Sequence, residues 1–199
     1  MENQRIEDEN HPVYALLEEA YRKLDTGLLQ SAIDQGADIN LATERLPFGI
    51  YAMLEPFTFD GENDEPFPEE MTRKWFESKS KVIEMLTIAV DNGLLMNECS
   101  DIGGGVYYPI LSFLIRCPDD IEFVDWLIDH GFDPVHVYDV WPQFQDLTEM
   151  AESAFLDKEH NYCRWLLKLC VHLMDRFPEL NEQYDYNKLR TMEKKLSEI

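Results

Sequence analysis

Four residues near the carboxyl end of the sequence are of the types that bind zinc: His160, Cys163, Cys170 and His172. Structural zinc sites hold four such His and Cys ligands in a tetrahedron. The spacing in this chain matches no common zinc pattern. Trp165 and several leucines surround the two cysteines, and a free cysteine in such surroundings behaves as a small hydrophobic side chain. We therefore expect no metal site here.

Other catalytic chemistry would need patterns that this sequence lacks. A serine nucleophile of the elbow type needs Gly-x-Ser-x-Gly, and no cysteine lies in a nucleophile signature. The glycine triplet at 103–105 is neither Gly-x-Gly-x-x-Gly nor a phosphate loop with its lysine. Adjacent carboxylates such as Asp119-Asp120 are expected by chance among 40 acidic residues. We expect no enzymatic activity and no cofactor.

Net charge is the most informative feature of the composition. The 199 residues include 40 acidic and 17 basic side chains, which gives a formal net charge of −23. Hydrophobic residues make up 45% and aromatic residues 12%, so the chain can fill a core and is not a disordered acidic tail. The scarcity of bases disfavours direct binding to nucleic acid or to an anionic membrane. The charge indicates either a role in solubility or a basic protein as the partner.

The acidity is concentrated ahead of the last fifth of the chain. Residues 161–199 hold six acids and seven bases, whereas the first 160 residues carry a net charge of −24. The densest segment runs from Glu55 to Glu70, with seven acids and no base. Its three prolines and one glycine prevent a continuous helix. We expect an acidic insertion at about residues 55–78. It is either a solvated flap or a partner-docking arm that carries Phe57, Phe59 and Phe67.

The N-terminus and the cysteines indicate a compartment. The first ten residues contain neither the basic nor the apolar region of a secretory signal. No apolar run approaches the roughly 18 residues that a membrane-spanning helix needs. The four cysteines are widely spaced, which is typical of reduced thiols rather than of a disulfide framework. We expect a cytoplasmic protein, with a monomer favoured.

Helical periodicity, together with the residues that start and stop helices, indicates repeated units. Three helices are predicted to end at glycines: Gly36, Gly93 and Gly131. Upstream of each, a helix is predicted to begin at a proline: Pro12, Pro47 and Pro109. The proline-to-glycine separations are 24, 46 and 22 residues, and the long middle one contains the acidic insertion. Such repetition is typical of a solenoid.

These units resemble the ankyrin repeat, whose second helix ends in Leu-Leu-x-x-Gly-Ala-Asp-x-Asn. Residues 32–40, Ala-Ile-Asp-Gln-Gly-Ala-Asp-Ile-Asn, match that ending almost position for position, and residues 126–134 match it less closely. Residues 108–114 resemble a degenerate Thr-Pro-Leu-His turn, and a fourth unit spans residues 146–170 without a terminal Gly-Ala-Asp. The resemblance implies an all-α solenoid of about four helix pairs over residues 1–172. A C-terminal capping helix would follow over residues 173–199.

The resemblance also implies where a partner binds. Ankyrin-family proteins usually bind through the β-turn fingers between helix pairs and through their inner helices. Residues 101–108 would form one finger, and aromatic residues ringed by acids would suit a Lys/Arg-rich partner. The predicted partner-binding residues are Asp60, Glu62, Asp64, Glu65, Glu69, Glu70, Asp101, Tyr107, Tyr138, Trp141 and Phe144. The alternative for Trp141 and Phe144 is that they pack inside the repeat stack.

These observations favour a protein-binding module that neutralises a basic partner. Its overall character is similar to that of bacterial immunity proteins, some of which are ankyrin-like and protect against nuclease or other toxins. One alternative is a general ankyrin-type adaptor or scaffold whose acidity serves only solubility. Another is a DNA mimic, which would compete with DNA for the same enzyme. A toxin gene directly upstream would favour the immunity function over the adaptor.

Overall fold

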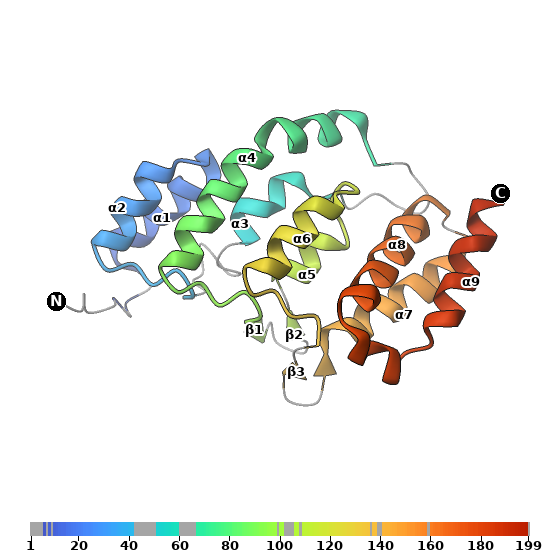
Figure 1. The fold of residues 1–199 in the computed structure, drawn as a ribbon. Coiled ribbons are helices and arrows are strands. Elements are labelled where there is room, and N and C mark those ends of the chain that lie inside the picture. The colour runs from blue at the N-terminus through green and yellow to red at the C-terminus, as the bar shows by residue number, and fades with distance from the viewer. Residues whose placement is uncertain are drawn as a thin grey trace. The chain divides into compact units, whose positions relative to one another are not determined.

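The computed structural model describes residues 6, 8, 10–41, 51–59, 67–98, 100–101, 106–107, 109–135, 137–138, 141–158 and 160–198. The described part is mainly helical, which confirms the predicted all-α class (Figure 1). The helices are α1 (Pro12–Lys23), α2 (Thr26–Asp34), α3 (Tyr51–Leu54), α4 (Glu69–Asp91), α5 (Pro109–Leu114), α6 (Ile121–Asp129), α7 (Gln143–Leu156), α8 (His160–Arg176) and α9 (Tyr186–Ser197), with 3₁₀ turns η1 (Glu55–Phe57) and η2 (Pro178–Glu182).

Two short antiparallel hairpins precede helices α5 and α7. Strand β1 (Ser100–Asp101) pairs with β2 (Val106–Tyr107), and β3 (Val137–Tyr138) pairs with β4 (Trp141–Pro142). The first hairpin brackets the glycine triplet at 103–105, which lies outside the described residues. A hairpin therefore forms where the finger over residues 101–108 was predicted.

The chain divides into two compact units. The first consists of Met1–Thr58 and Glu69–Phe113, and the second of Phe59–Pro68 and Leu114–Ile199. In the first unit α1 packs against α2, α3 packs against α1, and α4 packs against α2, so that one helix pair stacks on the next. In the second unit α7 packs against α8, and α8 packs against α9.

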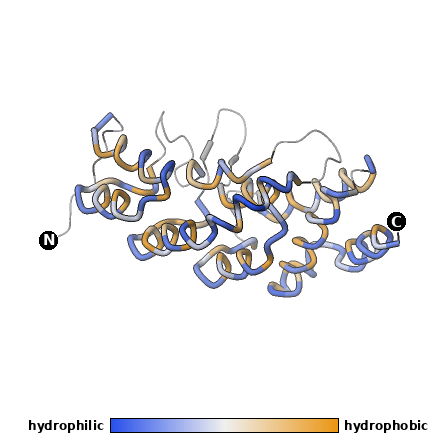
Figure 2. Tube along the Cα trace, turned by 90° about the horizontal axis from the view of Figure 1, so that it is seen from above, coloured by the Kyte–Doolittle hydropathy of each residue, from blue (hydrophilic) through white to orange (hydrophobic). Residues whose placement is uncertain are grey.

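Helix α1 shows how local sequence fixes each element. Pro12 occupies the first turn, where a missing N–H does no harm, and the His11 Nδ1 atom accepts a hydrogen bond from the Val13 N–H at 3.3 Å. Arg22 and Lys23 lie in the last turn, where positive charge interacts favourably with the helix dipole. One face of the helix is buried through Val13, Tyr14, Leu17, Ala20 and Tyr21, and Figure 2 shows how hydrophobic residues alternate with hydrophilic ones along the helices.

The three predicted glycine stops are confirmed. The φ angle is 93° at Gly36, 91° at Gly93 and 106° at Gly131, in the left-handed region. In each copy the N–H of the next residue donates to the carbonyl five residues back, at 3.0 Å, 2.9 Å and 2.9 Å in chain order. This hydrogen bond is the one that closes a helix in the Schellman motif. The chain therefore makes the same turn three times.

Asn40 joins the first of these turns to the second. Its Nδ2 group donates to the Gly93 carbonyl at 2.9 Å, and its Oδ1 atom accepts from the Leu95 N–H at 2.9 Å. Asp38 orients this residue, because its carboxylate accepts from the Asn40 N–H at 3.0 Å. One amide side chain thus satisfies a donor and an acceptor more than 50 residues further along the chain.

The segment ahead of α1 is bonded to the first glycine turn. The Ile6 N–H donates to the Gly36 carbonyl at 3.0 Å. The Tyr14 hydroxyl donates to the Ile6 carbonyl and accepts from the Asp38 N–H at 3.2 Å. Tyr21, on the same helix, is also fully buried, but its hydroxyl has no hydrogen-bond partner in the described part of the chain.

Some boundaries differ from those predicted. Helix α4 begins at Glu69 rather than near Val82, so residues 69–78 belong to a 23-residue helix and not to a loop. The last proline of the insertion is Pro68, so a helix can begin directly after it. Trp75 lies one to two turns into this helix and is buried, and its packing stabilises the additional N-terminal turns. The predicted start at Pro47 lies outside the described residues, and α3 begins at Tyr51.

The carboxyl end also differs in detail. Helix α8 continues to Arg176, and η2 then precedes α9, so the predicted single helix after Pro178 is divided. Helix α9 buries Leu189, Met192 and Leu196 and keeps its other residues half-buried or exposed. A polar outer face of this kind is what the end of a helical stack requires.

We predict that Asn40→Ala lowers the free energy of unfolding by about 1–2 kcal/mol, because two hydrogen bonds between the turns are lost. The matched control is Asn92→Ala. Asn92 is exposed and bonds only within its own helix end, to the Ile88 carbonyl at 2.8 Å. Chemical denaturation should show a change within about 0.5 kcal/mol for the control. Equal losses in the two variants would show that Asn40 does not join the turns.

The two buried tyrosines give a second prediction. Tyr14→Phe should destabilise the protein by about 1–2 kcal/mol, because it leaves the Ile6 carbonyl and the Asp38 N–H without their partner. Tyr21→Phe should leave the stability unchanged or raise it by up to about 1 kcal/mol, because a buried hydroxyl without a partner is itself unfavourable. Thermal and chemical denaturation of the two variants measure the contrast. A similar loss in both would mean that a buried water satisfies Tyr21.

Candidate functional site

The acidic residues predicted to bind a partner fall into two groups. Asp60, Glu62, Asp64 and Glu65 lie outside the described residues. Glu69 and Glu70 form the first turn of α4, are exposed, and make no ion pair within the described part of the chain. Acidic side chains are favourable in that turn because of the helix dipole. They stay available to an external cation.

Of the three phenylalanines of the insertion, one is buried against α4 and the other two contact each other. Phe57 is 3% exposed and meets Trp75 edge-on, with 5.4 Å between ring centroids. Phe59 and Phe67 are half-buried and meet edge-on at 5.8 Å, and the Phe59 N–H donates to the Arg116 carbonyl at 2.9 Å. Phe57 is therefore a core residue and offers no surface to a partner, whereas Phe59 and Phe67 stay predictions as contact residues of the arm.

The predicted hairpin residues occupy the two strand pairs. Asp101 lies opposite Val106, Tyr107 lies opposite Ser100, and Tyr138 lies opposite Trp141. Their side chains lie outside the described residues, so Asp101, Tyr107, Tyr138 and Trp141 stay predictions as contact residues. The backbone register is nevertheless fixed.

Phe144 was predicted to contact the partner, and this prediction is wrong. It is 1% exposed and packs edge-on against Tyr184 with 5.0 Å between centroids. A side chain in the core offers no surface to another protein. Burial raises the pKa of Tyr184, and the negative charges of Glu149 and Asp146 raise it further. The surface beside Phe144, rather than Phe144 itself, carries the acidic character.

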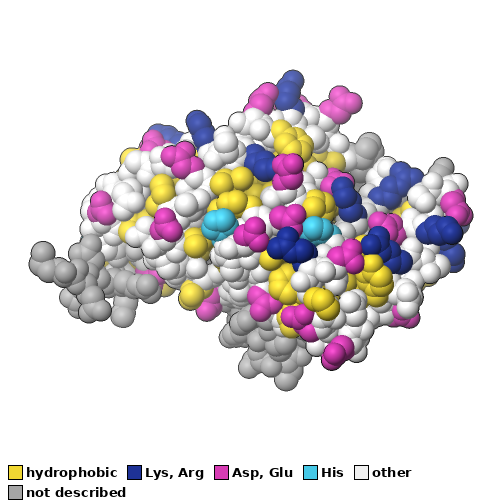
Figure 3. All heavy atoms as spheres, viewed as in Figure 1, with side chains coloured by type: hydrophobic (Ala, Val, Ile, Leu, Met, Phe, Trp, Pro, Cys, Tyr) yellow, Lys and Arg dark blue, Asp and Glu magenta, His cyan; other side chains and the backbone are white. Residues whose placement is uncertain are grey.

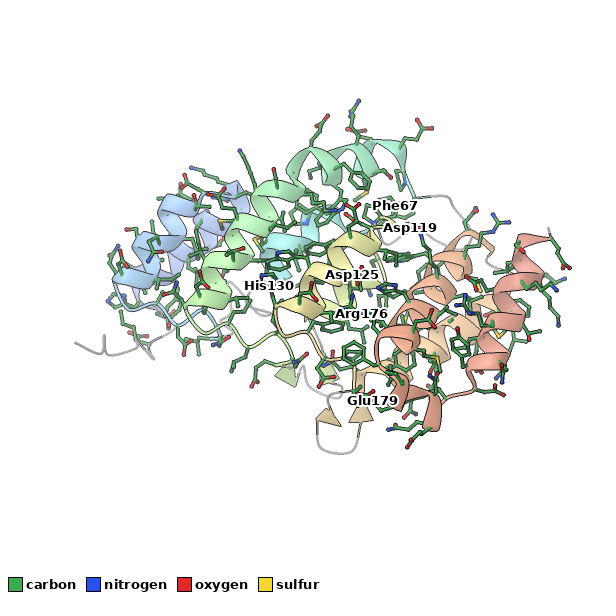
Figure 4. All side chains as sticks on the ribbon, in the orientation of Figure 1. Phe67, Asp119, Asp125, His130, Arg176 and Glu179 are labelled. Carbon is green, nitrogen blue, oxygen red and sulfur yellow. The ribbon has the colours of Figure 1, made fainter. Side chains whose placement is uncertain are left out.

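A row of contacts joins α6 and its preceding turn to α8. The Lys168 ammonium contacts the Asp119 carboxylate at 2.6 Å, and the His172 Nε2 atom contacts the Asp125 carboxylate at 2.9 Å. Arg176 bridges Asp125 at 2.5 Å and Asp129 at 3.1 Å. The three α8 residues are four apart and so share one helix face. Figure 4 labels Asp119, Asp125 and Arg176 in this row, which we call the α6–α8 ladder.

Bases of α9 are paired in the same way. Lys188 contacts Glu152 of α7 at 2.5 Å, and Arg190 contacts Asp175 at 3.1 Å and Glu193 at 3.0 Å. In Figure 3 the Lys and Arg side chains over α8 and α9 lie among Asp and Glu side chains. The basic residues that make the carboxyl end nearly neutral therefore also form ion pairs. Several of its bases neutralise acids that lie earlier in the chain.

The cysteines and the adjacent aspartates that could have taken part in catalysis have roles in packing, ion pairing or helix capping. Cys163 and Cys170 are fully buried free thiols, and burial raises the pKa of Cys170, which makes it a poor nucleophile. Within the described residues no group of three or more His, Cys, Asp or Glu side chains could hold a metal ion. Asp119 pairs with Lys168, and Asp120 caps α6 by accepting from the Phe123 N–H at 3.1 Å.

Comparisons with known proteins add no assignment to this geometry. No family model, no curated protein and no solved structure matches the chain. Among the described helices, none is both long enough and apolar enough to cross a membrane.

The α6–α8 ladder gives a prediction for Arg176→Met, which keeps the aliphatic stem and removes the charge. Two half-exposed carboxylates lose a shared partner, so the free energy of unfolding should fall by about 1 kcal/mol, and by less in high salt. Arg73→Met changes the net charge equally, but its pair with Glu77 is 3.9 Å long and both side chains are 69% exposed. Denaturation should show almost no loss for this control. Equal losses would mean that net charge, and not the ladder, is responsible.

Proposed function

We propose that this chain is an acidic protein-binding module that binds and neutralises a basic partner protein. We further propose that it is built as a degenerate ankyrin-like solenoid. Three glycine turns closed by the same hydrogen bond, the stacking of α3 on α1 and of α4 on α2, and hairpins ahead of α5 and α7 support this architecture. Each of these features occurs more than once along the chain, as expected for a protein built from repeats.

The distribution of charge pairs carries the functional proposal. The bases of α8 and α9 contact acids of α6, α7 and their own helices. With 40 acids and 17 bases in the chain, internal pairing cannot neutralise the remaining carboxylates. So large an excess of negative charge destabilises the folded protein by self-repulsion, and a cationic partner relieves that repulsion on binding.

Charge excess also suits rapid capture. Long-range attraction steers a cationic protein toward an acidic surface and raises the association rate, which an inhibitor of a toxic enzyme needs. An immunity protein that blocks a cognate bacterial toxin fits this requirement best. The buried free thiols Cys117, Cys163 and Cys170 support a reducing cytoplasm as its location.

A general adaptor is the competing function, since acidity can serve solubility alone. The two functions differ in their consequences for the partner. An inhibitor abolishes the activity of its partner at equimolar concentration, whereas an adaptor leaves it intact. A toxin gene directly upstream supports the inhibitor. Competition between this protein and DNA for the same enzyme would indicate DNA mimicry.

A charge-reversal experiment tests the proposal on the partner recovered from the native cell by affinity purification. The triple variant Glu62→Lys, Asp64→Lys, Glu69→Lys should weaken binding by at least about tenfold. The control variant Glu179→Lys, Glu182→Lys, Glu198→Lys makes the same change in net charge at exposed positions of the carboxyl end. It should weaken binding by less than about threefold.

Calorimetry at two salt concentrations completes the test. For the unmodified chain, affinity should fall by at least about tenfold between about 50 mM and about 300 mM NaCl, because ions screen the exposed charges. Salt-independent binding contradicts the proposal. Equal effects of the two triple variants would place the interface away from the insertion.

A further inference from the structure

The repeated turn allows one position to be compared three times within the chain. The second residue after the left-handed glycine is Asp38 in the first copy, Leu95 in the second and Asp133 in the third. In the first and third copies the carboxylate accepts a hydrogen bond from the N–H two residues ahead, at 3.0 Å from Asn40 and at 2.8 Å from Val135. The backbone therefore favours an aspartate at this position.

Leu95 departs from this pattern in a way that stability does not explain. A leucine has no oxygen for the turn, and this one is 52% exposed. The residue that follows it, Met96, is 7% exposed and fills the buried position, as Ile39 does in the first copy at 4%. Leu95 thus gains no core packing in exchange for the lost hydrogen bond. It also leaves apolar surface in water.

The backbone of Leu95 is held firmly. Its N–H donates to the Asn40 Oδ1 atom at 2.9 Å, and its carbonyl accepts from the Glu98 N–H at 3.2 Å. Because the backbone is already bonded, a partner that covers Leu95 does not have to order the main chain there. Exposure and rigidity together are the properties of an interface anchor.

The charged residues nearest to Leu95 along the sequence are both acidic. Asp91 ends α4 four residues earlier, and Glu98 closes the turn three residues later. Both are exposed, and neither makes an ion pair within the described part of the chain. A leucine with carboxylates on both sides complements an apolar side chain that lies between two cations.

We infer that Leu95, flanked by Asp91 and Glu98, is an apolar anchor for a partner segment that presents Leu, Met or Phe between Lys or Arg residues. This inference rests on the proposed function and adds a contact to it. A second copy of the chain is a poor occupant, because pairing two such surfaces would bring four carboxylates together between chains of net charge −23.

The test uses the full chain and two displayed peptide libraries. Peptides of the first library carry Leu, Met or Phe between two Lys or Arg residues, and those of the second carry Ser in place of the apolar residue. The variants are Leu95→Asn, which restores a side-chain oxygen at the turn, and Leu95→Asp, which also adds a negative charge. The control is Leu156→Asn, at a leucine that is 77% exposed beside Asp157.

The unmodified chain should enrich peptides from the first library over the second. Leu95→Asn should weaken the selected peptides by at least about tenfold, with unchanged or higher melting temperature, and Leu156→Asn by less than about twofold. Leu95→Asp separates the two forces: an anchor predicts weaker binding, whereas charge alone predicts tighter binding.

The remaining outcomes contradict one proposal or the other. Equal enrichment from both libraries, or unchanged binding by Leu95→Asn, overturns the anchor and leaves the acidic binding module standing. Failure to enrich from either library overturns the anchor, whereas the acidic binding module falls only if the affinity for the recovered partner is independent of salt. A lower melting temperature for Leu95→Asn than for Leu156→Asn would show that Leu95 is a structural residue and would also overturn the anchor.

Discussion

The closure of α2, α4 and α6 by a left-handed glycine is the constraint on which the rest of the structure depends. At Gly131 a methyl group would meet nothing within 4 Å, so glycine is required there by its φ of 106° and not by lack of space. Once the turn is made, the residues that follow take fixed inward and outward positions. Asn40 depends on this register, because only a correctly turned chain presents the Gly93 carbonyl and the Leu95 N–H to one side-chain amide.

The second unit depends on electrostatic pairing as well as on packing. Helix α8 packs against α7 and α9, and its charged face carries the α6–α8 ladder. Each of these half-exposed pairs is individually weak. Together they place the cations of α8 against the carboxylates of α6 and of the turn before it. This arrangement limits self-repulsion inside the unit while leaving the excess negative charge elsewhere.

Local features of the fold could be predicted from the sequence, whereas partners distant in the chain could not. The stops at Gly36, Gly93 and Gly131 follow from short-range rules, and the structure has all three. The ladder joins residues 47 to 51 positions apart, and no pattern in one sequence pairs Asp125 with Arg176. Phe144 was misassigned for the same reason. Its neighbour Tyr184 lies 40 residues away, so an aromatic residue near a finger could not be distinguished from one in the core.

Internal repetition supplies a comparison that a single sequence otherwise lacks. Three copies of one turn show which side chain the backbone favours, and the exposed Leu95 is interpretable only because Asp38 and Asp133 define that preference. The distinction matters for specificity. Attraction between opposite charges draws any cationic surface toward an acidic protein, including unsuitable ones, and it weakens with salt. An apolar contact flanked by two carboxylates would add a requirement of shape that charge alone does not impose, so the proposed anchor would favour one partner among many basic proteins.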